Sequence, residues 1–171
     1  RFDIGIELYW HHDEHVLSIA FPLDVRADTA ACDIQFGHVR RPTHPSNSWD
    51  AAKFEVCAHR YVDLAEPGFG VAVLNDGRYG HGLFDGGIRV TLARAAKYPD
   101  PGADHGRHRV GLAVLAHGAG LDDVIAEAER FNVPLRVVSG SGADAPLPIV
   151  SLTGSGVEID AVKLADGDPR D

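Results

Sequence analysis

The stretch between positions 44 and 59 contains the residue types of nucleophilic catalysis. Two serines, two histidines and a carboxylate, the components of a serine-type triad, occur there together: His44, Ser46, Ser48, Asp50 and His59. The GxSxG turn that exposes a catalytic serine is absent from the sequence. Cys57 would share one face of a strand with His59, but it lies in an apolar run, where a thiol packs as a small hydrophobe. No catalytic residue is therefore predicted here, and cross-strand hydrogen bonding accounts equally well for the histidines.

A second polar run, HHDEH at positions 11–15, has the composition of a metal site. Zinc in proteins is held by histidine and carboxylate ligands. Residues four apart share a face on a helix, whereas the residues on both sides of this run alternate as those of strands do. We therefore interpret the run as a solvated hairpin turn and predict no metal ligand. A small metallohydrolase built on His11, His12 and His15 is kept as an alternative hypothesis.

The elements that would position these residues are mostly β-strands. Apolar and polar residues alternate at 2–10, 17–21, 53–58 and 88–92, which is the period of a half-buried strand. Further strands are expected within 30–39 and at 69–74, 110–115, 135–138, 149–152 and 157–164. Apolar residues at 121–131 are spaced by three and four, which predicts a helix of about three turns. The chain is therefore predicted to be an all-β antiparallel sandwich with one short helix.

Two connections between strands carry polar residues at strand ends, where a rigid scaffold commonly presents functional side chains. The run Asn75-Asp76-Gly77 favours the positive-φ geometry of a tight hairpin. Residues 97–107 form a long loop rich in proline, glycine and aspartate. Trp49 lies in a turn and is expected in the core, with a domain seam or stacking on a sugar as the alternatives. Residues 1–171 are predicted to form a single β-sandwich domain with a frayed tail at 166–171.

Motifs spread over most of the chain resemble a known family. The segments RPTH, SWD, KFEVCAH, DL, GFGVAVLND and YG at positions 41–80, with PDPGADHGRHRV at 99–110, resemble the C-terminal β-domain of the family 38 glycoside hydrolases, the α-mannosidases. The chain departs from that pattern at Ser46-Asn47, where the family has Asn-Thr, at Ala65, where it has serine, and at Arg78, where it has lysine.

This resemblance implies one sandwich of a larger C-terminal β assembly of the galactose-mutarotase-like, supersandwich type. It also implies that the catalytic residues, and a zinc ion or another divalent metal, belong to an upstream catalytic domain. Asp76, Asp100 and Asp104 are then loop formers, not the paired carboxylates of glycoside hydrolysis. Since the family's β-domain contributes loops to the active-site rim, we carry that role over to six positions: Asn75, Asp76, Tyr79, Asp104, Arg107 and His108.

The function expected from the resemblance is that of a non-catalytic β-domain, inactive alone. It would shape the active-site rim and support the catalytic domain of a retaining, metal-dependent enzyme that hydrolyses terminal α-mannosides. Its partners would be the upstream catalytic domain of the same chain and the α-mannoside substrate, and homo-oligomerisation is left open. The alternative is a stand-alone carbohydrate-binding module, which should expose a flat aromatic platform that the sequence does not reveal.

Composition argues against several other partners. A net charge of −9 in 171 residues disfavours nucleic acid held through its phosphates and an anionic membrane surface. No apolar run approaches the about 20 residues of a membrane helix. Two cysteines make no disulfide framework and favour a cytoplasmic protein. The chain lacks methionine and begins at Arg1 within a strand pattern, so we expect a fragment of a longer protein.

Overall fold

The computed structural model describes residues 1–84, 86–135, 137, 139, 150–154, 157, 159, 161–163 and 167. The chain divides into two units, Arg1–Leu135 and Arg136–Asp171. All of the helices and strands described below belong to the first unit. No helix in the described part of the chain is both long and apolar enough to cross a membrane.

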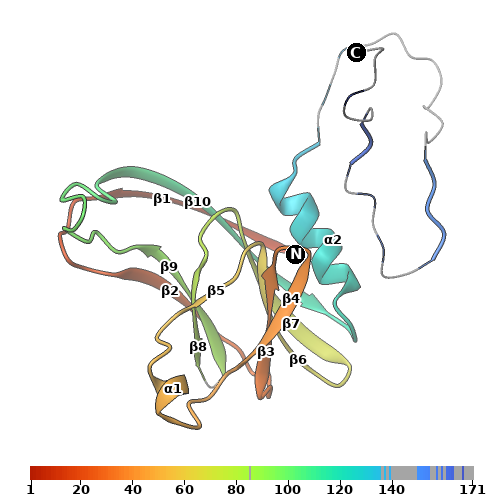
Figure 1. Cartoon of the computed structure of the whole chain (residues 1–171), viewed down its shortest axis with the longest axis horizontal. Helices are drawn as coiled ribbons and strands as arrows, with labels where there is room; N and C mark the ends of the chain where they lie inside the picture. The colour runs from red at the N-terminus through yellow and green to blue at the C-terminus, as the bar shows by residue number, and fades with distance from the viewer. Residues whose placement is uncertain are drawn as a thin grey trace. The chain divides into compact units, whose positions relative to one another are not determined.

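The first unit is an all-β sandwich of two antiparallel sheets, as the alternating sequence predicts (Figure 1). The six-stranded sheet has the order β1 (Phe2–Trp10), β10 (Gly106–His117), β7 (Phe69–Asn75), β6 (Tyr61–Glu66), β3 (Thr29–Ile34) and β4 (Gly37–Pro42). The four-stranded sheet has the order β2 (Leu17–Pro22), β9 (Gly87–Ala93), β8 (Gly80–Phe84) and β5 (Val56–Cys57).

The main core lies between the two sheets. Alternate residues of the central strands β6, β7 and β10 face the four-stranded sheet, and Val62, Val73 and Leu112 are fully buried there. Ile88 and Val90 of β9 pack against them from the other side. This arrangement follows from the period of two in a strand, which places every second side chain on the same face.

The helix α2 (Asp122–Asn132) covers the outer face of the six-stranded sheet. Its Val124 and Ala128 are buried against Leu74 of β7 and Ala113 of β10, in a second apolar cluster. Asp122 and Asp123 lie in its first turn and Arg130 in its last, as the helix dipole favours. The predicted helix at 121–131 is confirmed, and the side chains of its inner face account for the apolar spacing.

Four local expectations differ from the structure. Within 53–58 only Val56–Cys57 forms a strand. The preceding turn contains a short helix, α1 (Ser48–Ala51), because the Asn47 side chain accepts a hydrogen bond from the N–H of Asp50 (2.9 Å). Trp49 is 81% exposed, so its expected place in the core is wrong. The loop expected at 97–107 ends earlier, since β10 begins at Gly106.

The strands expected at 135–138, 149–152 and 157–164 fall largely outside the described residues. The described members of these segments, such as Leu135 and Leu152, belong to no strand. The tail expected at 166–171 also lies outside the described residues, apart from Gly167.

Candidate functional site

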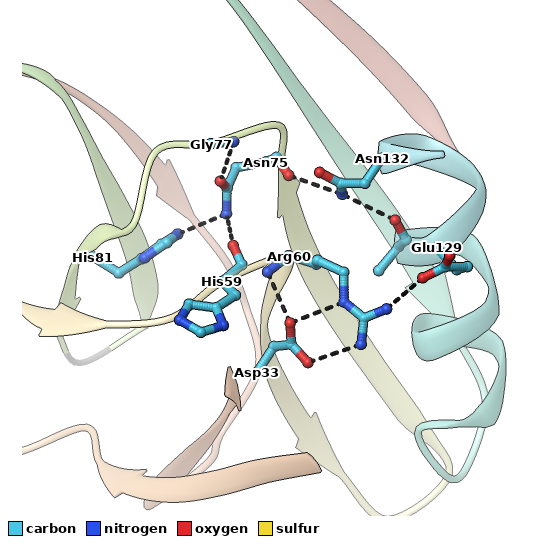
Figure 2. Close-up of polar contacts among 9 residues, drawn as sticks. Asp33, His59, Arg60, Asn75, Gly77, His81, Glu129 and Asn132 are labelled. Atoms are coloured by element: carbon cyan, nitrogen blue, oxygen red, sulfur yellow. Dashed lines mark hydrogen bonds and ion pairs between the residues drawn. The ribbon is translucent and has the colours of Figure 1, made fainter. Parts of the chain in front are cut away.

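The turn between β7 and β8 is shaped by a buried asparagine. Asn75 is fully buried, and its Oδ1 accepts hydrogen bonds from the backbone N–H groups of Gly77 (2.9 Å) and Arg78 (2.7 Å), as Figure 2 shows for Gly77. Its Nδ2 donates to the carbonyl oxygen of His59 (2.5 Å). An asparagine that bonds to backbone two residues ahead imposes a tight turn. Asn75 therefore fixes the direction in which Arg78 and Tyr79 leave the sheet.

A buried histidine supports the next step of this turn. His81 is fully buried, and its Nδ1–H donates to the carbonyl oxygen of Tyr79 (3.1 Å). Its Nε2 lies 3.5 Å from the Asn75 Nδ2, which donates toward it (Figure 2). Burial lowers the pKa of His81, so the neutral Nδ1–H tautomer is the resident form. The Tyr79 ring lies 5.1 Å from the His59 ring and is 52% exposed.

Asp104 organises the second predicted loop. Its carboxylate accepts hydrogen bonds from the backbone N–H groups of Arg94 (2.8 Å) and Ala95 (3.1 Å), which lower the pKa of this carboxyl group. Its φ of 60° lies in the left-handed region that aspartate tolerates better than most residues. The loop is therefore held against the end of β9 by a charged acceptor with two backbone donors.

A chain of hydrogen bonds joins the two loops. The Nε2–H of His108 donates to the carbonyl oxygen of Asp104 (2.7 Å). Because that nitrogen carries the proton, Nδ1 of His108 is free to accept from the Arg78 guanidinium, whose Nη2 lies 3.2 Å away. Arg78, His108 and Asp104 thus connect the β7–β8 hairpin to the loop that precedes β10.

A hollow of about 290 Å³ lies where these loops meet the four-stranded sheet, and it is lined in part by Arg78, Tyr79, Arg94 and Asp104. A neighbouring hollow of about 580 Å³ shares Glu55, Thr91 and Arg94 with it and adds the exposed ring of Phe54. The two form one shallow groove on the outer face of the sheet, which we call the outer groove.

Glycines on β8 and the side chains around them explain the outer groove. Gly80 lines the smaller hollow, and a Cβ atom there would lie 3.3 Å from the Glu55 carboxylate. A Cβ atom at Gly82 would lie 2.8 Å from the Arg89 guanidinium. Glu55 accepts a hydrogen bond from the Thr91 hydroxyl. Because Gly80 and Gly82 have no side chains, this part of β8 forms the shallow floor of the outer groove. The longer side chains of Glu55 and Arg89 surround it.

The chemistry available in the outer groove is that of binding. In the described part of the chain, the guanidinium groups of Arg89 and Arg94 have no hydrogen bond or ion pair, so both are available to an incoming acceptor. Exposed aromatic rings of Tyr79 and Phe54 lie beside them. Planar donors next to aromatic faces suit a ligand rich in hydroxyl groups. The carboxylates are occupied by hydrogen bonds, since Asp104 binds backbone and Glu55 binds Thr91.

The structure brings three of the six predicted rim residues together: Tyr79 and Asp104 line the smaller hollow, and His108 binds Asp104. Asn75 is buried beneath them. Asp76 accepts a hydrogen bond from the N–H of Gly111 (2.8 Å). Arg107 alternates with His108 along β10 and so points to the opposite face, where it pairs with Glu7 (2.8 Å).

Sequence reasoning missed Arg78, Arg94, Glu55 and Thr91. Arg78 directly follows the recognised Asn-Asp-Gly turn, so its position at the hairpin tip was a usable signal. Glu55 directly precedes β5, whereas Thr91 and Arg94 lie at the end of β9, and their proximity depends on the registers of both strands against β8, in which His81 pairs with Val56 and with Val90. Those registers cannot be read from composition or alternation alone.

The alternative chemical groupings do not assemble. Ser46 Oγ lies 2.8 Å from His44 Nδ1, but Asp50 binds Asn47 and Lys53 instead of either histidine. In the run at 11–15, His15 contacts the carbonyl oxygen of Asp13. Across the described residues, no group of three or more His, Cys, Asp or Glu side chains has the arrangement to hold a metal ion.

Comparison with known proteins gives one family match. The model of the family described as "Glycosyl hydrolases family 38 C-terminal domain" matches residues 1–102. The human protein named "Alpha-mannosidase 2C1" is 40% identical over 171 residues, which cover 96% of this chain and 16% of that protein. The Saccharomyces cerevisiae protein named "Alpha-mannosidase" is 41% identical over 124 residues, covering 72% of this chain and 11% of that protein.

The fold also matches solved structures. The crystal structure of an alpha-mannosidase from Enterococcus faecalis superimposes with a TM-score of 0.65 at 21% identity, over 73% of this chain and 15% of that one. At 21% sequence identity, this structural similarity shows that the two proteins share a fold. The chain thus spans a small part of the length of the relatives that it matches.

Proposed function

This chain belongs to the glycosyl hydrolase family 38 C-terminal domain family, and from that premise we propose that it serves as the non-catalytic β-domain of a longer α-mannosidase. In that role it supports the catalytic domain and contributes the outer groove to the rim of the active site. The parent enzyme would act on terminal α-mannosides. The proposal takes its substrate class from the relatives named α-mannosidase.

The observation that carries the rim assignment is the hydrogen-bonded chain from Arg78 through His108 to Asp104. It connects two loops that are about thirty positions apart in sequence and holds both beside the smaller hollow. A rim that must keep its shape next to a catalytic domain needs such cross-links, because loops without them sample many conformations. Tyr79 and Arg94 are then the side chains best placed to contact a sugar.

The reaction itself would take place on residues outside this chain. Glycoside hydrolysis needs two carboxyl groups about 5–9 Å apart, one of them as acid and one as nucleophile or base. The acids of the outer groove are held by hydrogen bonds, and the described residues do not fit a divalent metal. We therefore propose that the catalytic carboxylates, and the zinc ion or other divalent metal, belong to the catalytic domain.

A cytoplasmic location is part of the same proposal. Cys32 is buried and Cys57 is exposed, and both are free thiols. An exposed free thiol persists in a reducing compartment and is prone to oxidation outside one.

The rim assignment is tested in the full-length enzyme that contains these residues. Tyr79→Ala and Arg94→Ala should each lower kcat/KM for an aryl α-mannoside by roughly tenfold, equivalent to about 1.4 kcal/mol of transition-state binding. Arg107→Ala is the matched control, since Arg107 is exposed on the opposite face of β10, and it should leave kcat/KM unchanged. Equal effects of the three substitutions would refute the rim assignment.

The absence of catalysis in the chain itself needs a separate assay. The 171-residue chain should give no turnover of an aryl α-mannoside above the buffer rate, with or without added zinc. Clear turnover would show that the catalytic residues lie within it and would overturn the proposed division of roles.

Exposed aromatic side chains favour a second candidate, a stand-alone carbohydrate-binding module. Trp49 and Phe54 are each 81% exposed, although they lie in a sequence region where buried residues were expected. Aromatic faces of this kind stack on sugar rings. Calorimetric titration of the 171-residue chain with mannose oligosaccharides discriminates the two candidates. A module binds with measurable heat, and that heat is lost in Trp49→Ala or Phe54→Ala, whereas an isolated rim gives none.

A further inference from the structure

The outer groove contains arginine side chains whose charge no acidic residue neutralises. Arg78, Arg89 and Arg94 line it, and none of the three forms an ion pair in the described part of the chain. Its two carboxylates bind neutral groups: Glu55 accepts from a hydroxyl group, and Asp104 accepts from backbone N–H groups. Three positive charges thus meet two negative ones, in a chain whose net charge is −9. The outer groove is a locally cationic surface on an acidic protein.

Arg89 is held in place although its guanidinium forms no hydrogen bond within the described residues. It lies on β9 opposite Gly82 of β8, and the two strands run side by side (Figure 1). A Cβ atom at Gly82 would lie 2.8, 2.9 and 3.1 Å from the Nη2, Nε and Cζ atoms of Arg89. These similar distances show that the guanidinium lies flat across the glycine, in the space that a side chain would fill. Its N–H donors are therefore positioned before any ligand arrives.

The hollow of about 580 Å³ in the outer groove, which we call the larger hollow, presents further groups beside this guanidinium. Ser18 of β2 lines it, and its hydroxyl group has no hydrogen bond in the part of the chain that the structure describes. Arg94 lines it from the end of β9. The exposed ring of Phe54 forms part of its wall, and aromatic faces pack against the C–H groups of sugars. One hollow thus combines two free guanidinium groups, a free hydroxyl group and an aromatic ring.

A phosphate monoester matches these donors best. It carries a charge of about −1.5 to −2 at pH 7 and three acceptor oxygens, whereas a carboxylate carries a single charge and two oxygens. Arginine binds phosphate through two parallel N–H···O bonds. Because the phosphate oxygens point in different directions, two arginines and a hydroxyl group can bind one phosphate at the same time. A neutral sugar would leave both guanidinium charges without a counter-charge.

We infer that the larger hollow binds a phosphate monoester carried by a sugar, with Arg89 as the principal phosphate ligand. Arg94 and Ser18 complete the phosphate site, and Phe54 contacts the sugar ring. The phosphate part of the inference stands on the geometry and charge of the groove. The sugar part rests on the proposed function, since a domain that borders an α-mannosidase active site meets sugars.

Calorimetric titration of the 171-residue chain at pH 7.5 tests the ligand class. Mannose 6-phosphate should bind at millimolar concentration, and mannose should give no measurable heat. Absence of heat with mannose 6-phosphate, or equal binding of mannose, would overturn the inference. The titration involves no catalysis, so its outcome is separate from the kinetic test of the rim, which uses an aryl α-mannoside without phosphate.

Two more probes identify the charged group and its carrier. Mannuronic acid, which carries a carboxylate in place of the phosphate, should bind at least about tenfold more weakly than mannose 6-phosphate. Equal binding of the two would overturn the choice of phosphate. Inorganic phosphate should also bind more weakly, because it lacks the sugar ring that contacts Phe54. Inorganic phosphate that binds as tightly as mannose 6-phosphate would overturn the sugar part of the inference.

Arg89→Gln tests whether this arginine holds the phosphate. The substitution should weaken binding of mannose 6-phosphate by at least about tenfold, because a charge-assisted pair of hydrogen bonds is lost. Arg40→Gln is the matched control. Arg40 is also exposed, and its guanidinium has no hydrogen bond among the described residues, but it lies on β4 in the other sheet. The two variants change the net charge equally, so equal weakening would show attraction by charge without a site and would overturn the inference.

Gly82→Ala tests the position of Arg89 without removing it. The added Cβ atom displaces the end of a flexible side chain, and Gly82 has no positive φ, so the fold should lose little stability. Mannose 6-phosphate should nevertheless bind several-fold more weakly, because the guanidinium can no longer lie across the strand. Gly5→Ala on β1, where an added Cβ meets nothing within 4 Å, is the control and should bind as the parent chain does. Unchanged affinity in Gly82→Ala would overturn the assignment of the phosphate to Arg89.

Discussion

The side-chain amide of Asn132, the last residue of α2, donates a hydrogen bond to the backbone carbonyl of Asn75 (3.1 Å), the last residue of β7 (Figure 2). The same Nδ2 also donates to the carbonyl of Ala128 (3.0 Å), one turn earlier in the helix. Because Asn75 shapes the turn that carries Arg78 and Tyr79, the helix on one sheet is joined to the hairpin that borders the outer groove.

Asn75→Ala should lower the free energy of unfolding by about 3 kcal/mol. The substitution leaves the carbonyl of His59 and the N–H groups of the following turn without their buried partner, and each such group costs about 1–3 kcal/mol. Asn132→Ala removes bonds to two carbonyls near a helix end, and about 1 kcal/mol is expected. Urea unfolding of the two variants gives the comparison. Equal losses would show that Asn75 is not the centre of this network.

Arg60 is the second residue that ties α2 to the sheets. Its Nε donates to Asp33 (3.1 Å) and its Nη1 to Glu129 (2.5 Å), as Figure 2 shows. The Asp33 side chain is 3% exposed, whereas that of Glu129 is 47% exposed. Hydrogen bonding to Asp33 raises the pKa of Arg60 above its ordinary value, so the guanidinium stays charged.

Arg60→Met should therefore destabilise the fold by about 3–5 kcal/mol, because it leaves the Asp33 carboxylate buried without its cation. Glu129→Gln is the matched control, since it changes the exposed partner of the same arginine, and a loss of no more than about 1 kcal/mol is expected. Both values come from denaturant unfolding at pH 7. A loss below about 1 kcal/mol for Arg60→Met would mean that Asp33 finds another partner.

The sequence predicted the sandwich, the helix and the family, and all three are confirmed. These features depend on local alternation, on helical spacing and on a long motif. The ion pairs of Arg60 could not be predicted, since its partners lie 27 and 69 positions away and meet it through strand register. The exposure of Trp49 was missed because a short helix capped by Asn47 turns the ring outward, where an extended turn toward the core was expected.

The two cysteines should differ strongly in reactivity. Cys32 is fully buried, and burial raises the pKa of its thiol to about 11. At pH 8 its thiolate fraction is then about one in a thousand, and the thiolate is the species that reacts with iodoacetamide. Cys57 is exposed and should be alkylated first. Mass spectrometry of the native chain should show one added group on Cys57, with the second appearing only at the rate of unfolding. Early labelling of Cys32 would contradict its burial.

The last prediction concerns the pH dependence of stability that His81 contributes. Burial lowers the pKa of His81 in the folded chain below its ordinary value of 6.5. In the pH window below 6.5, the unfolded chain therefore binds a proton that the folded chain does not, and stability rises with pH there. The stability that neutral His81 contributes is present in full above pH 6.5. It is lost as the pH falls toward the pKa of His81 in the folded chain, and the free energy of unfolding then changes by at most about 1.4 kcal/mol per pH unit.

His81→Asn removes this titration while it keeps a donor near the position of Nδ1, which binds the carbonyl of Tyr79. The variant is expected to be less stable at every pH, because it leaves space in a fully buried site. Its stability should nevertheless fall less steeply than that of the parent chain between pH 7 and pH 5. The other nine histidines are present in both proteins, so the difference between the two urea-unfolding curves isolates His81. Parallel curves would show that His81 takes up its proton equally well in the folded and unfolded chain, which full burial beside Asn75 and Tyr79 argues against.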